Sequence, residues 1–261
     1  MEVVVLKLGG ASLQNLKTLE SLALMLKDLL QSGVRPVIIH GGGPAINEEL
    51  TRRGISWAFI NGQRQTTPEM MEVIEEVLAN NVNGLIVHEL NASGLNTIGL
   101  SGAEDKILFC SQTNAELQQV GKVEVVELSS IKRILENSTD VIPVIAPIGI
   151  GYQGEKYNIN ADWAASKIAV ALHATKLIFL TDQNGILDGE GALIDVATAE
   201  YIHEMIRTGV IHGGMYTKVL TMMMAIEEGI SEVQVLNALL SHQYGRGPLG
   251  TRLVDNYSPK C

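Results

Sequence analysis

Two short apolar runs lead directly into glycines, and this pattern constrains the fold more than any other feature of the chain. Residues 3–6 are followed by Lys7 and by glycines at 9–10, and residues 37–39 precede glycines at 41–43, with a helical pattern after each junction. Continuous apolar runs of this length are typical of strands buried on both faces of a parallel sheet. Ligands of such sheets bind beyond the carboxyl ends of the strands, so both sets of glycine amides are predicted to lie at one ligand-binding edge.

The two glycine junctions favour an anion as the ligand. Glycine amides can approach a phosphate closely, and Lys7 would add a positive charge beside them. Taken alone, Lys7 could equally be a surface lysine next to an ordinary turn, and the second junction is what favours the phosphate site. Neither junction has the Gly-Lys-Ser/Thr ending of a P-loop or the G-x-G-x-x-G spacing of a dinucleotide site, which disfavours those two classes.

Composition limits the partners of the protein. The 261 residues are 46% hydrophobic and 18% charged, which suits one large α/β domain or two lobes that share a sheet. The formal net charge of −10 argues against binding to nucleic acids or to anionic membranes. Cys110 and Cys261 are too few for a structural zinc site, and no disulfide between them is expected. The sequence has neither a signal-peptide pattern nor an apolar run long enough to span a membrane, and a cytoplasmic location is expected.

The rest of the chain is mostly an alternation of strand and helix patterns. This alternation predicts an α/β fold with a mainly parallel sheet covered on both faces. Pro143 weakens the assignment of its strand, because proline cannot donate to a sheet ladder. Buried strands are expected over residues 3–6, 37–39, 96–100, 141–145, 177–180 and 233–236, and hairpin or edge strands over 107–110 and 122–128.

Arg64 is a candidate for binding a substrate carboxylate. It follows a predicted hairpin turn at Asn61 and Gly62, and it precedes a long helix that Thr67 and Pro68 are expected to begin. A lone loop arginine is more often a solvated side chain. Its position downstream of the second glycine junction favours the alternative that it binds a carboxylate through two parallel hydrogen bonds.

Asn158, Asn160 and Asp162 alternate at or just before the start of a helix predicted over residues 164–172. One of them would suffice as the N-cap, so three polar residues in this spacing suggest a further role.

Two later segments are unremarkable when each is considered alone. Thr181 and Asp182 follow the strand at 177–180 as an ordinary polar turn would, and Lys218 lies in a predicted helix, where a lysine is usually solvated.

Taken together, these segments resemble the amino acid kinase family over nearly the whole chain. Each is weak alone, but all of them in this order are specific for the family, and the Asn-x-Asn-Ala-Asp form resembles its acetylglutamate branch, as does the context of Arg64. The matching segments are Lys7-Leu8-Gly9-Gly10, His40-Gly41-Gly42-Gly43, Asn61-Gly62-Gln63-Arg64, Asn158-Ile159-Asn160-Ala161-Asp162, Thr181-Asp182 with Gly185-Ile186-Leu187, and Gly213-Gly214-Met215 with Lys218.

The resemblance implies a fold, a reaction and a division of labour. The implied fold is α/β, a three-layer αβα sandwich around a mainly parallel central sheet. The implied reaction is ATP-dependent phosphorylation of the γ-carboxylate of N-acetyl-L-glutamate to an acyl phosphate, in arginine biosynthesis. Residues 1–172 would form an N-terminal lobe that binds the amino acid, and residues 173–261 a C-terminal lobe that binds ATP, within one continuous domain. Mg²⁺ would arrive with ATP and be held mostly by phosphates and water, so no protein ligand for a metal is assigned.

The resemblance also implies roles for individual residues. Lys7 would stabilise charge on the γ-phosphoryl side, Lys218 charge on the leaving ADP, and Asp162 would hold both ammonium groups in place. The amides of Gly10 and Gly42 would donate to phosphoryl oxygens. The residues expected to bind the acid are Gly42, Gly43, Arg64 and Asn158, and those expected to line the nucleotide pocket are Thr181, Asp182, Gly185 and Met215.

Two departures from the family bear on assembly. Gly84 stands where relatives often have lysine, which could alter the long helix or a subunit contact. The chain begins directly at its first strand, whereas arginine-inhibited relatives carry an extra N-terminal helix that links dimers into hexamers. The resemblance therefore favours a homodimer that is insensitive to arginine.

Competing assignments are considered beside this one. The nearest is a kinase of the same family that acts on another carboxylate, such as carrier-bound aminoadipate. Glutamate 5-kinase usually has an added C-terminal domain, which nothing after Val254 could supply, and uridylate kinase would need a more basic surround for its acceptor than Arg64 provides. A ligand-sensing relative without activity is disfavoured, because a binding module would not need both Lys7 and Lys218 beside Asp162.

Overall fold

An eight-stranded sheet forms the centre of the protein in a computed structural model, which describes residues 2–255. The strand order is β12-β14-β13-β11-β1-β2-β8-β5, and all neighbours are parallel except β13 and β14. The predicted α/β class with a mainly parallel sheet is therefore confirmed. The strands are β1 (Val3–Leu8), β2 (Arg35–His40), β5 (Asn96–Ser101), β8 (Val141–Ala146), β11 (Lys176–Thr181), β12 (Val196–Thr198), β13 (Glu232–Asn237) and β14 (Thr251–Val254).

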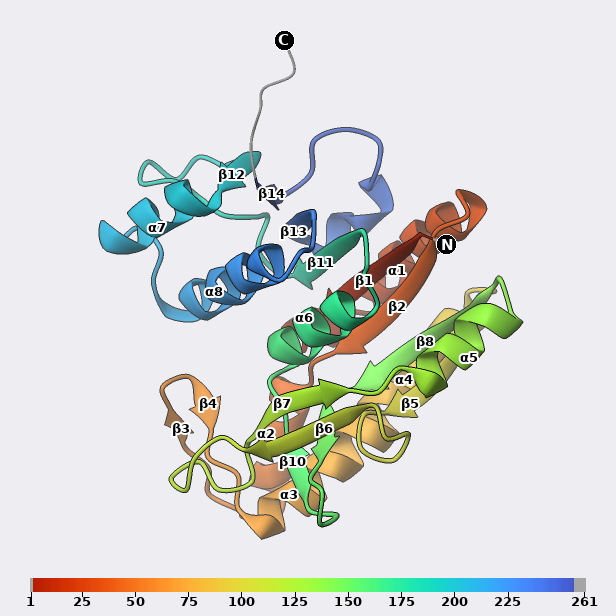
Figure 1. Cartoon of the computed structure of the whole chain (residues 1–261), viewed down its shortest axis with the longest axis vertical. Helices are drawn as coiled ribbons and strands as arrows, with labels where there is room; N and C mark the ends of the chain where they lie inside the picture. The colour runs from red at the N-terminus through yellow and green to blue at the C-terminus, as the bar shows by residue number, and fades with distance from the viewer. Residues whose placement is uncertain (1, 256–261) are drawn as a thin grey trace.

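Helices cover both faces of this sheet, which gives the expected three-layer αβα sandwich (Figure 1). One layer contains α1 (Leu16–Gln31), α2 (Gly43–Arg52), α3 (Pro68–Glu75), the π-helical segment η2 (Glu76–Val82) and α4 (Asn83–Ala92). The other layer contains α5 (Ser129–Asn137), α6 (Ala161–Ala171), α7 (Ala199–Arg207) and α8 (Gly213–Glu227). Two short 3₁₀ segments, η1 (Ala11–Gln14) and η3 (Ala238–Gln243), follow β1 and β13.

The alternation of side chains along the central strands decides which layer each site residue faces. On β1, Val5 packs in the core beneath α6 and α8, whereas Leu6 packs in the core beneath α1 and α4. Lys7 therefore faces the α6 layer. On β2, Ile39 belongs to the core beneath α6 and α8, so His40 faces the α4 layer.

Two smaller sheets complete the fold. The predicted hairpin of β6 (Leu108–Gln112) and β7 (Gly121–Val126) is antiparallel and joins β9 (Ile148–Ile150) and β10 (Lys156–Asn158) in a four-stranded sheet. The second predicted hairpin consists of β3 (Phe59–Ile60) and β4 (Gln63–Arg64). Its turn residues Asn61 and Gly62 have φ values of 50° and 78°, the left-handed conformation that a two-residue hairpin turn requires.

Pro143 lies in an interior strand, in spite of the doubt that a proline raises there. The strand β8 has β2 on one side and β5 on the other, but β2 pairs with it only at Val144 and Ile145. Pro143 pairs with Ile98 of β5 alone. The sheet therefore accommodates the proline at a point where β8 has a single neighbour.

Two helices differ from the sequence expectation. The long helix that begins after the N-cap Thr67 is not uniform, because its middle turns, Glu76–Val82, are π-helical. Helix α6 begins at Ala161, earlier than residue 164, because the side chain of Asn160 accepts the amides of Asp162 and Trp163 and so caps the helix.

Cys110 is a free, buried thiol of the core, and burial together with the charge of Glu124 raises its pKa to about 12. Cys261 lies outside the described residues. Among residues 2–255, no helix combines the length and the apolar character needed to cross a membrane.

Candidate active site

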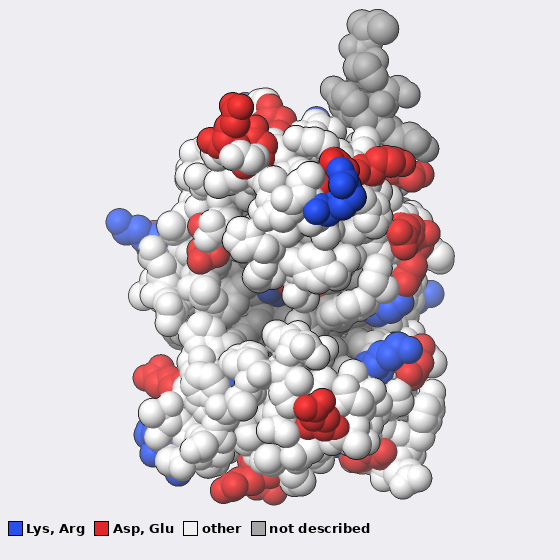
Figure 2. Space-filling model, turned by 90° about the vertical axis from the view of Figure 1, so that its left-hand side faces the viewer, with Lys and Arg blue, Asp and Glu red and all other residues white. Residues whose placement is uncertain are grey.

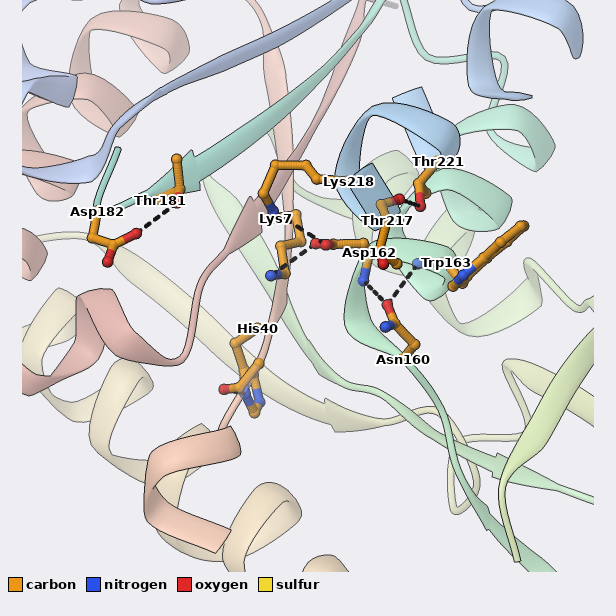
Figure 3. A network of polar contacts seen from close by, with 11 residues as sticks. Lys7, His40, Asn160, Asp162, Trp163, Thr181, Asp182, Thr217, Lys218 and Thr221 are labelled. Atoms are coloured by element: carbon orange, nitrogen blue, oxygen red, sulfur yellow. Dashed lines mark hydrogen bonds and ion pairs between the residues drawn. The ribbon is translucent and has the colours of Figure 1, made fainter. Parts of the chain in front are cut away.

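Lys7, Asp162 and Lys218 meet in one cluster (Figure 3). Lys7 Nζ lies 2.8 Å from Asp162 Oδ1 as an ion pair, and Lys218 Nζ donates to Asp162 Oδ2 at 3.1 Å. The three residues come from the end of β1, the first turn of α6 and the N-terminal half of α8. Their side chains are only 11–13% exposed, so the fold holds three charged groups in a largely desolvated position.

The two lysines keep the shared carboxyl ionised. Burial opposes ionisation of Asp162, but the charges of Lys7 and Lys218 outweigh it and lower the pKa of Asp162 to about 2. Burial also lowers the pKa of Lys218, an effect that Asp162 counteracts and Lys7 reinforces. Because one carboxylate balances two ammonium groups only in part, the cluster keeps a net positive charge that can receive an anion.

Phe179 supports Lys218 from the sheet. Its ring centroid lies 5.2 Å from Lys218 Nζ, within the range of a cation–π contact. Phe179 is fully buried on β11, in register with Lys7 of β1. The side chain therefore limits the positions that the Lys218 ammonium can take.

The two glycine segments approach each other closely. An ideal Cβ on Gly10 would lie 2.9 Å from the backbone nitrogens of both Gly42 and Gly43, a separation that real Cβ atoms do not show. Gly42 is the N-cap of α2, so its amide and that of Gly43 have no partner within the helix. The sequence prediction that the two junctions bring their amides together is confirmed.

A cavity of about 180 Å³ lies beside these glycines. Its lining includes Gly42, Gly43, Arg64 and Asn158, which come from α2, the β3–β4 hairpin and β10. Asn158 Nδ2 donates to Thr66 Oγ1 at 3.1 Å, which fixes the orientation of its amide. The four residues expected to bind the acid thus border one cavity.

Arg64 is buried, unlike a typical loop arginine, with only 6% of its surface exposed. Its guanidinium lies 5.0 Å from the Trp57 ring centroid and 4.8 Å from that of Phe59, and its Nη2 donates to Asn47 Oδ1. Burial lowers the pKa of Arg64. Its buried Nη1 has no hydrogen-bond partner among the described residues. A buried cation with an unsatisfied donor in a cavity wall suits a carboxylate ligand.

A second cavity, of about 380 Å³, lies at the start of α8. The N-cap of this helix, His212, makes no side-chain hydrogen bond to it, so the first amides of α8 and the positive end of its dipole can receive phosphate groups. The cavity is lined by Thr181, Asp182, Gln183, Gly214, Met215 and Lys218.

The face formed by α7, α8 and the β3–β4 hairpin is hollowed between its two halves (Figure 2). The acidic side chains visible on this face lie mostly away from the hollow. Although the chain as a whole has a formal net charge of −10, an anionic ligand can therefore enter here with little local repulsion.

Comparison with known proteins decides the family. The sequence profile of the amino acid kinase family matches residues 2–237. Acetylglutamate kinase from Ruegeria pomeroyi is 41% identical over 247 residues, which cover 93% of this chain and 85% of the relative. The chain belongs to the amino acid kinase family. Acetylglutamate kinase from Geobacter sulfurreducens is 39% identical over 251 residues, covering 92% of this chain and 86% of the relative. A crystal structure of a Streptococcus mutans UA159 protein matches this kinase with a TM-score of 0.84 and 29% identity, over 97% of this chain and 99% of that one.

Among the residues expected in the nucleotide pocket of this kinase, Gly185 stands apart. It is not among the residues that line the second cavity. Its φ is 152°, and an ideal Cβ would lie 2.6 Å from Leu193 Cδ1 and 2.7 Å from Thr251 Oγ1. Backbone conformation and close packing therefore account for this glycine.

The kinase offers no preformed metal site within residues 2–255, where no three His, Cys, Asp or Glu side chains are grouped to hold an ion. Asp182 is the carboxylate that lines the cavity at α8. A single carboxylate suits a cation whose other ligands are mostly phosphate oxygens and water molecules.

The sequence assigned no role to four residues that lie around the site of this kinase. Asn47 and Phe179 hold Arg64 and Lys218, and His40 and Asn83 form a buried pair behind the glycines. A histidine directly before three glycines and an asparagine at a core position of the long helix are the signals that could have drawn attention to the latter two.

Proposed function

We propose that this protein transfers the γ-phosphoryl group of ATP to the γ-carboxylate of N-acetyl-L-glutamate, which gives an acyl phosphate for arginine biosynthesis. The observation that carries the proposal is the sharing of Asp162 by Lys7 and Lys218 next to both cavities. Lys218 lines the cavity at α8, and Ala161, the neighbour of Asp162, lines the cavity that contains Arg64. The relatives named acetylglutamate kinase, at 39–41% identity, support the choice of acid.

The charged cluster suits phosphoryl transfer, which depends on positioning and charge compensation more than on covalent help from the protein. The attacking carboxylate is already ionised at neutral pH, so no general base is required. Lys7 stabilises charge on the transferred group and Lys218 charge on the leaving ADP, while Asp162 holds both ammonium groups. The amides of Gly10 and Gly42 donate to phosphoryl oxygens, in the manner of an oxyanion hole.

The cavity at the glycines binds the acid in this proposal. Arg64 has an unsatisfied Nη1 and binds the substrate's free carboxylate, and Asn158 binds its amide group. The Gly42 and Gly43 backbone assists from the start of α2. Because Arg64 is held by Asn47 and by two aromatic rings, little side-chain entropy is lost when the acid binds.

ATP binds at the start of α8 in this proposal, against Thr181, Asp182 and Met215. The division of labour follows the chain: the acid cavity is lined by residues up to Ala161 and the nucleotide cavity by residues from Thr181 onward. We therefore assign acid binding to residues 1–172 and ATP binding to residues 173–261, within one continuous domain. Mg²⁺, bound with ATP, would neutralise phosphate charge, with Asp182 as the carboxylate beside it.

The test is an assay that traps the acyl phosphate with hydroxylamine as a hydroxamate. We expect hydroxamate from N-acetyl-L-glutamate that depends on ATP, and none from free glutamate. A small panel of acids in the same assay examines the nearest alternative, since activity only with a carrier-linked acid such as aminoadipate would move the assignment to another kinase of the family. Binding of N-acetyl-L-glutamate without turnover would favour a ligand-sensing protein and contradict the proposal.

We also propose that the protein is a homodimer. Strand β5 lies at one edge of the main sheet. Its Ile98 is 41% exposed, and Leu85 on the adjacent helix α4 is 40% exposed. An apolar sheet edge of this kind favours pairing with a second copy. Light scattering should report a dimer, and Ile98→Lys should give monomers. Val125→Lys, which alters an exposed apolar residue on β7, is the matched control and should leave the dimer intact; a monomeric wild type would contradict the proposal.

A cytoplasmic location accompanies this proposal, because the reaction consumes ATP. Fractionation of cells that express a tagged chain would test it, and recovery of the protein outside the cytoplasm would contradict it.

A further inference from the structure

His40 is a fully buried histidine at the end of β2, directly before the three glycines. Its Nδ1 lies 3.1 Å from the carbonyl oxygen of Gly41, and its Nε2 lies 3.1 Å from Nδ2 of Asn83. Asn83 is itself 4% exposed, and its Nδ2 donates to the carbonyl oxygen of Val144 at 2.9 Å. His40 lies on the strand next to that of Lys7 (Figure 3). Neither His40 nor Asn83 lines the two cavities, so the proposed reaction leaves this pair without a role.

These contacts determine which nitrogen of the imidazole carries the proton. The carbonyl oxygen of Val144 can only accept, so the Asn83 atom that faces it is the amide nitrogen. The same nitrogen faces His40 Nε2, which must accept and therefore carries no proton. Burial, and to a smaller extent the charge of Lys7, lowers the pKa of His40 to about 4, so the ring is neutral. Its one proton lies on Nδ1 and is donated to the carbonyl oxygen of Gly41.

The bond to Gly41 sets the direction of the next amide. The peptide between Gly41 and Gly42 is trans, so the N–H of Gly42 points opposite to the C=O of Gly41. Because that C=O is held toward the imidazole, the N–H of Gly42 is directed away from it. Gly10 approaches the Gly42 nitrogen closely, with an ideal Cβ at 2.9 Å. In the proposed reaction the amides of both glycines donate to the transferred phosphoryl group.

We propose that Asn83 is a positioning residue that acts through His40 to aim the Gly42 amide at the transferred phosphoryl group. The inference rests on the proposed function for its catalytic consequence. A preorganised donor stabilises a transition state only if its direction is fixed before the reaction. A peptide between glycines has little conformational preference of its own, and the imidazole supplies the restraint that the glycine sequence lacks.

The π-helical segment η2 holds the same glycine from the other side. Its residues Leu78 and Val82 pack against Gly42, where any Cβ would clash with Leu78 and lie 3.5 Å from Val82 Cγ2. Asn83 follows immediately and begins α4 at a buried position. Single π-helical turns within α-helices are frequent at functional sites. One segment thus restrains Gly42 by packing and, through Asn83 and His40, by hydrogen bonding.

Two substitutions of His40 test whether the hydrogen bond donated by its Nδ1, rather than the size of its side chain, is what the reaction requires. In His40→Asn the side-chain amide can place its nitrogen near the former Nδ1, whereas in His40→Gln the amide reaches the former Nε2 position. We expect His40→Asn to retain kcat within about tenfold of the wild type and His40→Gln to lower kcat about 100-fold, with KM for ATP and for the acid little changed in both. Equal kcat in the two folded variants would overturn the proposal. His203→Gln, at an exposed site on α7, is the control and should leave kcat unchanged.

A double-mutant cycle tests whether Asn83 acts through His40. Asn83→Leu keeps the branched shape of the side chain but removes the donor, and we expect it to lower kcat roughly tenfold. In the His40→Gln background the same substitution should lower kcat no further, because residues that act as one unit are not additive. If the two losses multiply instead, Asn83 acts independently of His40 and the proposal is wrong.

The protonation of His40 can be read without any substrate, by nuclear magnetic resonance of the full chain labelled with ¹⁵N-histidine. We expect the Nδ1–H tautomer. An Nε2–H tautomer would overturn this inference while leaving the proposed kinase activity untouched. Conversely, an Nδ1–H tautomer in a protein that phosphorylates no acid in the panel would overturn the proposed function and, with it, the catalytic role of the pair.

Discussion

Lys7 and Asp162 form a 2.8 Å ion pair that ties the first strand of the sheet to the first turn of α6, and the other oxygen of the same carboxylate accepts from Lys218. The carboxylate lies between two ammonium groups that would otherwise repel each other.

Asp162→Asn keeps the shape of the side chain and removes its charge. We expect kcat to fall by a factor on the order of 10²–10³, because neither lysine is then held against the phosphoryl group. The free energy of unfolding should fall by roughly 3 kcal/mol, as when one partner of a largely buried pair is removed.

The control for this substitution is Glu228→Gln, which breaks the partly exposed ion pair between Glu228 and Lys167 at 2.6 Å. Such surface pairs contribute about 0–1 kcal/mol, so kcat should stay at the wild-type value and stability should change little. Hydroxamate formation at saturating substrates and denaturant unfolding measure the two effects. An Asp162→Asn enzyme with wild-type kcat would remove the basis of the proposed mechanism.

Replacing a lysine or Arg64 should affect different kinetic constants. Lys7→Ala and Lys218→Ala remove interactions made with the transferred and leaving groups, so each should lower kcat by about 10²-fold or more with a smaller change in KM. Arg64→Ala removes a contact to a part of the acid that does not react, so it should raise KM for the acid about tenfold or more with a smaller change in kcat. Initial rates over a range of acid concentrations separate the two patterns, and the opposite assignment of effects would mean that the roles are exchanged.

Much of this site can be predicted from the sequence, because the patterns that indicate it lie within short segments. The apolar run before Lys7 indicates a buried strand, and the rule that ligands bind at the carboxyl ends of strands places the lysine at a binding edge. The sequence alone does not single out Asp162, since Asn158, Asn160 and Asp162 can each cap a helix. The structure shows that Asn160 is the cap, which leaves the carboxylate of Asp162 available to the lysines.

The remaining features depend on contacts between distant segments, which no local pattern reports. The burial of Arg64 results from Trp57, Phe59 and Asn47, and a loop arginine gives no sign of such neighbours. The pairing of His40 with Asn83 depends on the π-helical turns of η2, whose apolar spacing resembles that of an ordinary helix.

Gly10→Ala should slow the reaction, because the added methyl group would meet the backbone of the second glycine segment. Alanine can adopt the φ of −61° that Gly10 has, so the backbone itself is not strained. The added Cβ would lie 2.9 Å from the nitrogens of Gly42 and Gly43, and it would have to displace backbone that provides the proposed phosphoryl donors. We expect kcat to fall about 100-fold, measured by the hydroxamate assay beside thermal unfolding.

The matched control is Gly84→Ala, because Gly84 lies in helix α4 and its added Cβ would meet nothing within 4 Å. Alanine in a helix interior is more favourable than glycine by about 1 kcal/mol, so this variant should be slightly more stable and fully active. If Gly10→Ala is as active as Gly84→Ala, the reaction does not depend on the positions of the Gly42 and Gly43 amides.

The stability of the protein should decline between pH 6.5 and about pH 4 because of His40. Burial lowers the pKa of His40 from 6.5 to about 4, so in this range the unfolded chain binds a proton at this residue that the folded chain does not. Proton binding by the unfolded chain favours unfolding. The free energy of unfolding should therefore decrease as the pH is lowered through this range, by roughly 3 kcal/mol from this residue. Denaturant unfolding at several pH values would measure the slope.

His40→Asn removes the titrating group and should flatten that part of the profile, whereas His203→Asn, at an exposed site, should retain the wild-type slope. Equal slopes in the wild type and in His40→Asn would mean that the buried imidazole is charged in the folded protein, which the donation from Asn83 to its Nε2 does not allow.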